Sequence, residues 1–210
     1  GNQQLQLGEF FDVSGSADDD LLVWRGDCTN VKWIGTQWQR GIVRVEGHAG
    51  MHLGAQMIGG EIEVDGSAGD WLGAEMRGGR IRVQGDAGHQ VGGAYRGGTI
   101  GMKGGEILIR GNAGNEVGRH MRRGLIAIGG SVGDFAGAGM IAGSILVAGA
   151  AGLRPGAGMK RGSIIFLRPQ ATMEPLQTFR IAGAFQPTFL RVMLNELQRS
   201  GISVPEGAWD

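Results

Sequence analysis

The chain has 210 residues, which is enough for one domain or for one domain with an appendage. Its 20 basic and 20 acidic residues cancel, so no long-range field of one sign would recruit nucleic acid or a membrane surface. The single cysteine, Cys28, excludes an internal disulfide and a cysteine-rich metal site. No signal-like apolar core follows Gly1, so we expect the protein in the cytoplasm.

Glycine dominates the composition. The chain contains 43 glycines, about three times the usual share of ~7%. The glycines have no period of three and proline is scarce, which excludes a collagen-like helix. Frequent valine, isoleucine, leucine and methionine argue against disorder. The spacing of the glycines should therefore be structural.

The first forty residues carry two apolar segments that contain glycines at bends. Phe11, Val13 and Gly15 form the first, and residues 22–40 form the second, in which Gly26 and Gly35 mark the bends. Both resemble the regular repeat that follows, with less exact spacing. We expect residues 22–40 to form an early coil of that repeat.

The repeat itself consists of three glycine columns with shared spacing. Successive members are 19, 19, 26, 19 and 19 residues apart, so one seven-residue insertion, placed around residues 99–105, interrupts all three columns together. The columns are Gly47, Gly66, Gly85, Gly111, Gly130 and Gly149; Gly50, Gly69, Gly88, Gly114, Gly133 and Gly152; and Gly54, Gly73, Gly92, Gly118, Gly137 and Gly156. We interpret them as structural corner glycines that supply positive φ and allow close approach of neighbouring coils.

Apolar residues alternate with a period of two between the glycines, which indicates short strands. Three apolar columns should point inward. They are Val43/Val45, Ile62/Val64, Ile81/Val83, Ile107/Ile109, Ile126/Ile128 and Ile145/Val147; Leu53, Leu72, Val91 and Val117; and Met57, Met76, Tyr95, Met121, Met140 and Met159. Coils stacked at about 4.8 Å would bury these residues in a continuous core. The pattern predicts an all-β, right-handed parallel β-helix, since about 98% of parallel crossovers have that hand.

The repeat stops after residue 167, and the last segment has a different pattern. We divide the chain into a β-helix at residues 1–168, an irregular linker with three prolines at 169–187, and a C-terminal helix and tail at 188–210. Residues 188–200 predict an amphipathic helix with Phe189, Val192, Met193 and Leu197 on one face. This helix could cap or cover the solenoid.

One outward column changes character along the stack. It is charged in the first coils and becomes apolar at Leu108, Ala127 and Leu146. An exposed apolar wall of this kind needs a cover. Either the C-terminal helix lies over it or a partner subunit docks there, and the sequence leaves both open.

A second candidate surface is a basic corner. The repeat alignment places Arg77, Arg96, Arg122 and Lys160 in one column, with Arg123 and Arg161 beside them. Like charges at coil spacing repel each other by a few tenths to ~1 kcal/mol. The corner is either solvated or paired within the chain, or it contacts an acidic partner surface or an anionic coenzyme tail.

No catalytic or metal-binding pattern is evident. The four histidines fall at turns in different columns, and Asp70, His89, Asn115 and Asp134 share a column where bonding to the local backbone is the simpler explanation. No Ser-His-Asp, HExxH or paired-carboxylate arrangement can be defended. Residues 135–153 are uncharged, but they follow the coil register, so we do not interpret them as a membrane span.

The motif Gly-x-Ala-Gly-x-x-x-Gly, repeated at residues 47–54, 66–73, 85–92 and 111–118, resembles the GXGXG family. That family includes the C-terminal domain of the large glutamate synthase subunit and the C subunit of formylmethanofuran dehydrogenase. Residues 122–130, 140–147 and 154–163 resemble the C subunit more closely, including that of the formyltransferase/hydrolase complex of methylotrophs. Arg119 and Pro155 depart from the repeat and could mark local contacts.

This resemblance implies a scaffold subunit without catalysis of its own, in a hetero-oligomeric complex that moves a formyl group between tetrahydromethanopterin and a furan coenzyme and releases formate. It assigns zinc and the furan coenzyme to partner subunits, and no cofactor to this chain. The alternatives are the C subunit of a tungsten or molybdenum formylmethanofuran dehydrogenase and the structural domain of a glutamate synthase. A carbohydrate-active β-helix enzyme is disfavoured, because the acidic residues alternate with arginines and do not converge.

Overall fold

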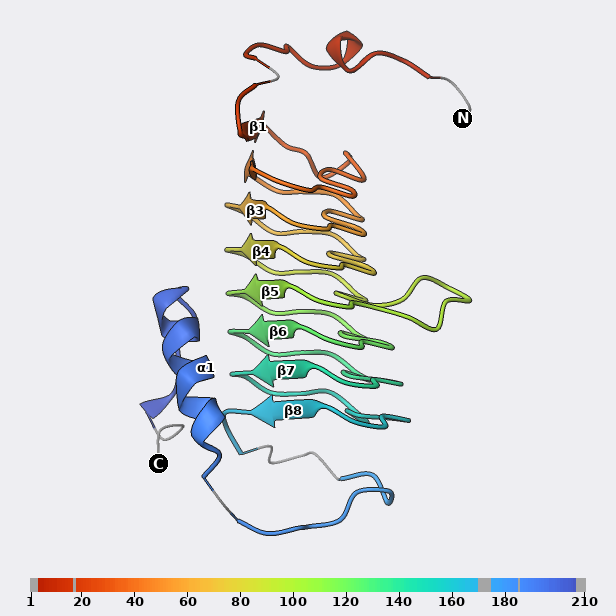
Figure 1. The fold of residues 1–210 in the computed structure, drawn as a ribbon, viewed down its shortest axis with the longest axis vertical. Helices are drawn as coiled ribbons and strands as arrows, with labels where there is room; N and C mark the ends of the chain where they lie inside the picture. Colours follow the sequence, from red (N-terminus) through yellow and green to blue (C-terminus); the bar gives the residue numbers. More distant parts are fainter. Residues whose placement is uncertain (1–3, 17, 170–174, 185, 207–210) are drawn as a thin grey trace.

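The computed structural model describes residues 4–16, 18–169, 175–184 and 186–206, and it forms a stack of coils (Figure 1). The described part contains one parallel sheet of eight strands, ordered as in the sequence. The strands are β1 (Leu21–Arg25), β2 (Ile42–Glu46), β3 (Glu61–Val64), β4 (Arg80–Val83), β5 (Glu106–Ile109), β6 (Leu125–Ile128), β7 (Ser144–Val147) and β8 (Ser163–Phe166). A short 3-10 helix, η1 (Leu7–Glu9), precedes them and α1 (Thr188–Arg199) follows them.

The strand register agrees with the spacing of the sequence repeat. Val43 pairs with Ile62 and Ile62 with Ile81, each a step of one repeat, and Ile81 pairs with Ile107 across the insertion. A second row of parallel bridges runs along another side of the stack, from Cys28–Ala49 to Val132–Ala151. The predicted parallel β-helix is confirmed, and residues 22–40 form its first regular coil, with β1 paired to β2.

The core is a continuous apolar column inside the coils. The inward residues of the strands, such as Ile62, Ile81 and Ile126, are fully buried, as are Leu72 and the other members of the second column. Each side chain of this size contributes about 1.5–3 kcal/mol when it leaves water. Residues 135–153 belong to this stack, and no helix in the described ranges is long and apolar enough to cross a membrane.

The two roles expected for the corner glycines, positive φ and close approach of coils, fall largely to different columns. Gly54, Gly73, Gly92, Gly118, Gly137 and Gly156 all have positive φ, from 58° to 74°. In the other two columns only Gly47 does, and these glycines instead allow coils to touch: an added Cβ on Gly66 would lie 2.6 Å from the Gly47 carbonyl oxygen. A fourth column with positive φ, unrecognised in the sequence, is Gly41, Gly60, Gly79, Gly105, Gly124, Gly143 and Gly162.

The insertion lies earlier than predicted. The Met102 N–H donates to the Gly92 carbonyl, as the Met76 N–H does to Gly73, so residues 93–101 form the extra loop, which projects in yellow-green in Figure 1. Met102 is fully buried and takes the inward position that the repeat alignment gives to Tyr95. An inward phenol would leave its hydroxyl without a partner, whereas methionine fills the same space at no polar cost. The placement of Tyr95 in the inward column is therefore wrong.

Helix α1 lies across the part of the sheet formed by the last coils (Figure 1), and its predicted position is confirmed. Its predicted face is partly wrong. Leu190, Met193, Leu194 and Leu197 pack on the sheet, while Phe189 and Val192 are exposed. Residues 170–174 and 185 of the predicted linker, and 207–210 of the predicted tail, lie outside the described residues.

Candidate functional site

The outward face of the first strands carries a ladder of ion pairs, as the alternating charges predict. Ladder pairs join neighbouring coils: Arg25 to Glu46 at 2.9 Å, Arg44 to Glu63 at 2.7 Å, Arg80 to Glu106 at 2.7 Å, and Arg82 to Glu61. All of these side chains are at least a quarter exposed. Exposed pairs contribute up to about 1 kcal/mol each, so the ladder chiefly fixes side-chain positions.

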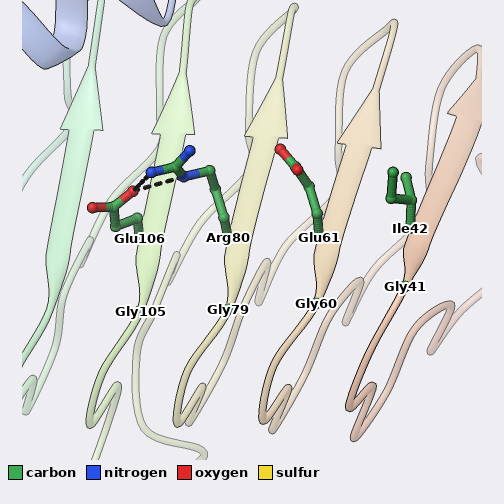
Figure 2. A pocket seen from close by; sticks show the side chains of 8 residues that line it. All are labelled: Gly41, Ile42, Gly60, Glu61, Gly79, Arg80, Gly105 and Glu106. Carbon is green, nitrogen blue, oxygen red and sulfur yellow. Dashed lines mark hydrogen bonds and ion pairs between the residues drawn. The ribbon is translucent and has the colours of Figure 1, made fainter.

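A shallow groove runs along the starts of strands β2 to β5 (Figure 2). Its floor is the row Gly41, Gly60, Gly79 and Gly105, which carries no side chains and leaves a hollow of about 580 Å³. Ile42, Glu61, Arg80 and Glu106 stand along one side, and Figure 2 shows Arg80 and Glu106 pointing toward each other. The groove is open along its length, which suits an extended surface contact better than an enclosed reaction.

Cations gather on the other side of this glycine row, at a place that we call the basic corner. The N–H groups of Arg77, Lys103, Arg122 and Lys160 each donate to a methionine carbonyl of the preceding coil, so these residues share one column. The column beside it holds further arginines. The basic corner consists of Arg40, Arg77, Lys103, Arg122, Arg123, Lys160 and Arg161, all of them exposed.

Arg96 does not belong to this corner, contrary to the sequence alignment. It lies in the loop of residues 93–101, and Lys103 takes its place because the insertion precedes Met102. The other five predicted cations do share the corner. Among the described residues, no member of the basic corner forms an ion pair, so the paired alternative finds no support in that part of the chain.

An aromatic cluster, unrecognised in the sequence, lies on another corner. Trp33, His52 and Trp71 stack on successive coils, with ring centroids 4.0 Å apart for Trp33–His52 and 5.4 Å apart for His52–Trp71. Tyr95 from the projecting loop packs beside them, and its hydroxyl lies 3.1 Å from His52 Nδ1. The signal was available, because the three stacked ring residues recur at the repeat spacing.

The surroundings of this cluster keep its titratable groups neutral. Burial lowers the pKa of His52, and the nearby charge of Lys32 lowers it further. Burial also raises the pKa of Tyr95 to about 12, with a smaller contribution from Glu75. Since both rings are neutral near pH 7, they share an uncharged hydrogen bond, and the cluster offers a rigid aromatic surface, of which Trp33 is 48% exposed.

The predicted apolar docking wall is not available to a partner. Leu108, Ala127 and Leu146 are buried under the chain's own C-terminal segment, so the proposal that a partner covers them is wrong. The four residues of that segment that complete this second core are Leu194, Leu197, Ile202 and Val204. Arg110 lies so close to Gly201 that an added Cβ would overlap its guanidinium, and a cation there suits the negative end of the α1 dipole.

The side chains of this turn column accept hydrogen bonds from backbone N–H groups. The donors belong to the next coil and not to the same turn. Asp70 accepts from the His89 N–H at 2.7 Å, His89 from Asn115 at 2.9 Å, and Asn115 from Asp134 at 2.9 Å. A parallel ladder begins at His48, which accepts from the Ser67 N–H at 3.0 Å. Among the described residues, no group of three or more His, Cys, Asp or Glu side chains could hold a metal ion.

Two further features lie elsewhere on the surface. A second hollow of about 960 Å³ lies between the last coils and residues 175–178, beside Phe135, Leu153 and Arg154. Arg119, which departs from the repeat, pairs with Glu116 at 3.1 Å. That ion pair gives Arg119 a role within its own coil.

The fold and these surfaces define a class: a β-solenoid that presents long external faces. The chain belongs to the GXGXG family, whose model, described as the GXGXG motif, matches residues 32–181. It is similar to a chain of the formyltransferase/hydrolase complex (FhcABCD) from Methylorubrum extorquens, solved in complex with methylofuran. The two are 38% identical, with a TM-score of 0.86, over 97% of this chain and 74% of that one.

Curated relatives match over a shorter stretch. The C subunit of the tungsten-containing formylmethanofuran dehydrogenase 2 of Methanothermobacter marburgensis is 43% identical over 59 residues, 26% of this chain and 22% of its own length. The C subunit of the molybdenum-containing formylmethanofuran dehydrogenase 1 of Methanosarcina barkeri is 43% identical over 57 residues, 25% of this chain and 19% of its own. The chain thus aligns with about a fifth of the length of these relatives.

Proposed function

We propose that this chain is the scaffold subunit of a formyltransferase/hydrolase complex. The observation that carries the proposal is the similarity to a chain of such a complex, at 38% identity over 97% of this chain with a TM-score of 0.86. The similarity therefore includes nearly the whole fold and not the glycine repeat alone. A rigid stack that keeps several long faces exposed is suited to holding other subunits at fixed separations.

The proposal assigns the chemistry to the partners. By the family resemblance, the complex transfers a formyl group between tetrahydromethanopterin and a furan coenzyme and releases formate, in the cytoplasm. Zinc and the furan coenzyme then belong to the partner subunits. This chain's outward carboxylates, such as Glu61 and Glu106, are engaged in ion pairs with arginine.

Affinity purification from the native host tests the assignment. The full chain, tagged at one end, should recover a stoichiometric set of larger subunits that mass spectrometry identifies as formyltransferase and amidohydrolase. The tag at the other end serves as the control for steric interference. Recovery of the chain as a well-behaved monomer with both tags would overturn the proposal.

A second candidate is the C subunit of a formylmethanofuran dehydrogenase, favoured by the 43% identity over 59 residues. It is the weaker candidate because that match covers only 26% of the chain. Metal analysis of the purified assembly separates the two. Tungsten or molybdenum would indicate the dehydrogenase, and their absence together with zinc would indicate the hydrolytic complex. A glutamate synthase domain would instead appear within a longer polypeptide.

A further inference from the structure

The basic corner differs from the rest of the surface in how its charges are compensated. On the strand face, the arginines Arg25, Arg44, Arg80 and Arg82 each pair with a glutamate. The two columns of the basic corner contain, coil by coil, Gln39-Arg40, Ile58-Gly59, Arg77-Gly78, Lys103-Gly104, Arg122-Arg123, Ile141-Ala142 and Lys160-Arg161. Half of these positions are cationic and none is acidic, so the corner lacks the compensation present on the other side of the glycine row.

This arrangement costs free energy in the isolated chain. The backbones of adjacent coils lie about 4.8 Å apart, and like charges opposite each other at that spacing repel by up to ~1 kcal/mol per pair. The row next to them, Gly79 and its equivalents, has no side chains that could intervene. The cations of this corner repel one another and lie beside an open groove. Such a surface is complementary to a negatively charged partner.

The dimensions indicate what kind of anion fits. From Arg40 to Arg161 the corner spans six coil steps, roughly 30 Å, which is far longer than a single small anion. Glutamates of the ladder, Glu61 and Glu106, line the far side of the groove and disfavour a polyphosphate backbone there. Arginine, which provides most of the cations, binds carboxylates in a planar, bidentate geometry.

We propose that the basic corner docks an acidic face of a partner polypeptide. The inference rests on the proposed function, since that partner is another subunit of the same complex, and it adds which surface of this chain makes the contact. The carboxylates of the partner replace the missing acidic residues of the corner. Docking therefore removes repulsion that the isolated chain retains.

Zero-length cross-linking tests this contact directly. A carbodiimide joins a lysine amine to a carboxylate as an amide, and two of the chain's three lysines, Lys103 and Lys160, lie in the basic corner. In the complex purified from the native host, we expect both to be linked to aspartate or glutamate of a co-purified enzyme subunit. Lys32, which lies beside the aromatic cluster, is the internal control. The variant Lys103→Arg/Lys160→Arg keeps the charge and should abolish these links.

Charge reversal provides the second measurement. Arg77→Glu/Arg122→Glu should weaken binding to the co-purified subunit by roughly tenfold or more at low salt, while the isolated chain melts at the same or a higher temperature. Arg154→Glu/Arg180→Glu, which changes the net charge equally outside the corner, should bind like the unmodified chain.

The outcomes separate the two proposals. If the unmodified chain recovers the enzyme subunits, but links form only at Lys32 or the two charge-reversal variants bind equally, the acidic-partner inference is overturned and the proposed function stands. If the unmodified chain recovers no enzyme subunit at all, both are overturned. Binding of nucleic acid to the purified chain, lost in Arg77→Glu/Arg122→Glu, would contradict the choice of partner.

Discussion

Glycine has two separate roles in this chain. It adopts a backbone conformation with positive φ, and it leaves room where a Cβ atom would overlap the next coil. At Gly118 the backbone adopts φ +68°, and the Ile145 side chain of the next coil leaves no room for a Cβ, which would lie 2.6 Å from Cδ1. At Gly97, in the projecting loop, φ is +80° but nothing lies within 4 Å of an added Cβ. The two positions allow the two costs to be measured separately.

We predict that Gly118→Ala destabilises the chain by more than Gly97→Ala. The left-handed backbone costs alanine about 1–2 kcal/mol at either position. At position 118, overlap with Ile145 adds about 1–3 kcal/mol, since the core is already filled. Urea unfolding followed by circular dichroism measures both differences in free energy of unfolding. Equal losses for the two variants would contradict the tight packing inferred for the corner column.

Tyr95 allows an equally local test, because it is the chain's only tyrosine. Burial raises its pKa to about 12, so the folded chain retains the phenol proton above pH 10, where the unfolded chain loses it. Stability is therefore lost as the pH rises from about 10 to 12. A spectrophotometric phenolate titration should have its midpoint near 12 in the folded chain and near 10 in concentrated urea. A folded midpoint near 10 would show that the aromatic cluster is open to water.

At the scale of the elements, most of the fold could be predicted from period alone. Val43, Ile62 and Ile81 fix the register, because a slip by one residue would expose the whole apolar face. The insertion could not be placed by the same reasoning, since Arg96-Gly97-Gly98 imitates the Arg77-Gly78-Gly79 turn. Only packing decides between the two alignments, and it favours Met102 over Tyr95 in the core.

The effect of truncating Met102 tests that alignment. Met102→Ala should destabilise the chain by about 2–5 kcal/mol, because it leaves a cavity among fully buried neighbours. Tyr95→Phe should cost only about 0.5–1.5 kcal/mol, the net worth of its hydrogen bond to His52. Thermal or urea unfolding provides the comparison. A larger loss for Tyr95→Phe than for Met102→Ala would favour the alignment that places Tyr95 in the core.

The C-terminal helix shows a second limit of sequence patterns. Both of its possible stripes are apolar, one with Phe189 and Val192 and one with Leu190, Met193, Leu194 and Leu197. The helical pattern predicts its existence, but the sheet beneath selects the leucine-rich stripe, which meets Leu108 and Leu146. Because both stripes are apolar, the sequence pattern alone predicts the buried face of the helix only in part.

Substitutions on the two stripes should have different consequences for stability. Leu194→Ala removes a fully buried side chain and should lower the free energy of unfolding by about 2–5 kcal/mol. Val192→Ala changes a residue that is 71% exposed and should stay within about 0.5 kcal/mol of the unmodified chain. Near-ultraviolet circular dichroism with urea titration reports both. Equal effects would mean that α1 does not cover the sheet in solution.

On the scale of the whole molecule, the sequence predicts the surfaces less well than the core. The repeat alignment identifies five cations of the basic corner, because like columns stack, but it misses the aromatic cluster, whose fourth ring comes from the loop. It also leaves open what covers Leu108, Ala127 and Leu146, since a distant segment supplies that cover. Surfaces depend on contacts between segments far apart in the chain, which a local period does not encode.

The central proposal is that this chain organises a formyl-transferring complex whose partner subunits carry out the reaction. Formate release, measured for the purified chain, for the partner subunits without it, and for the reassembled complex, tests the claim most directly. We predict no turnover by the chain, reduced turnover by the partners, and full turnover once the chain is restored. Formate release by the chain alone, or partners that assemble and react fully without it, would contradict the account.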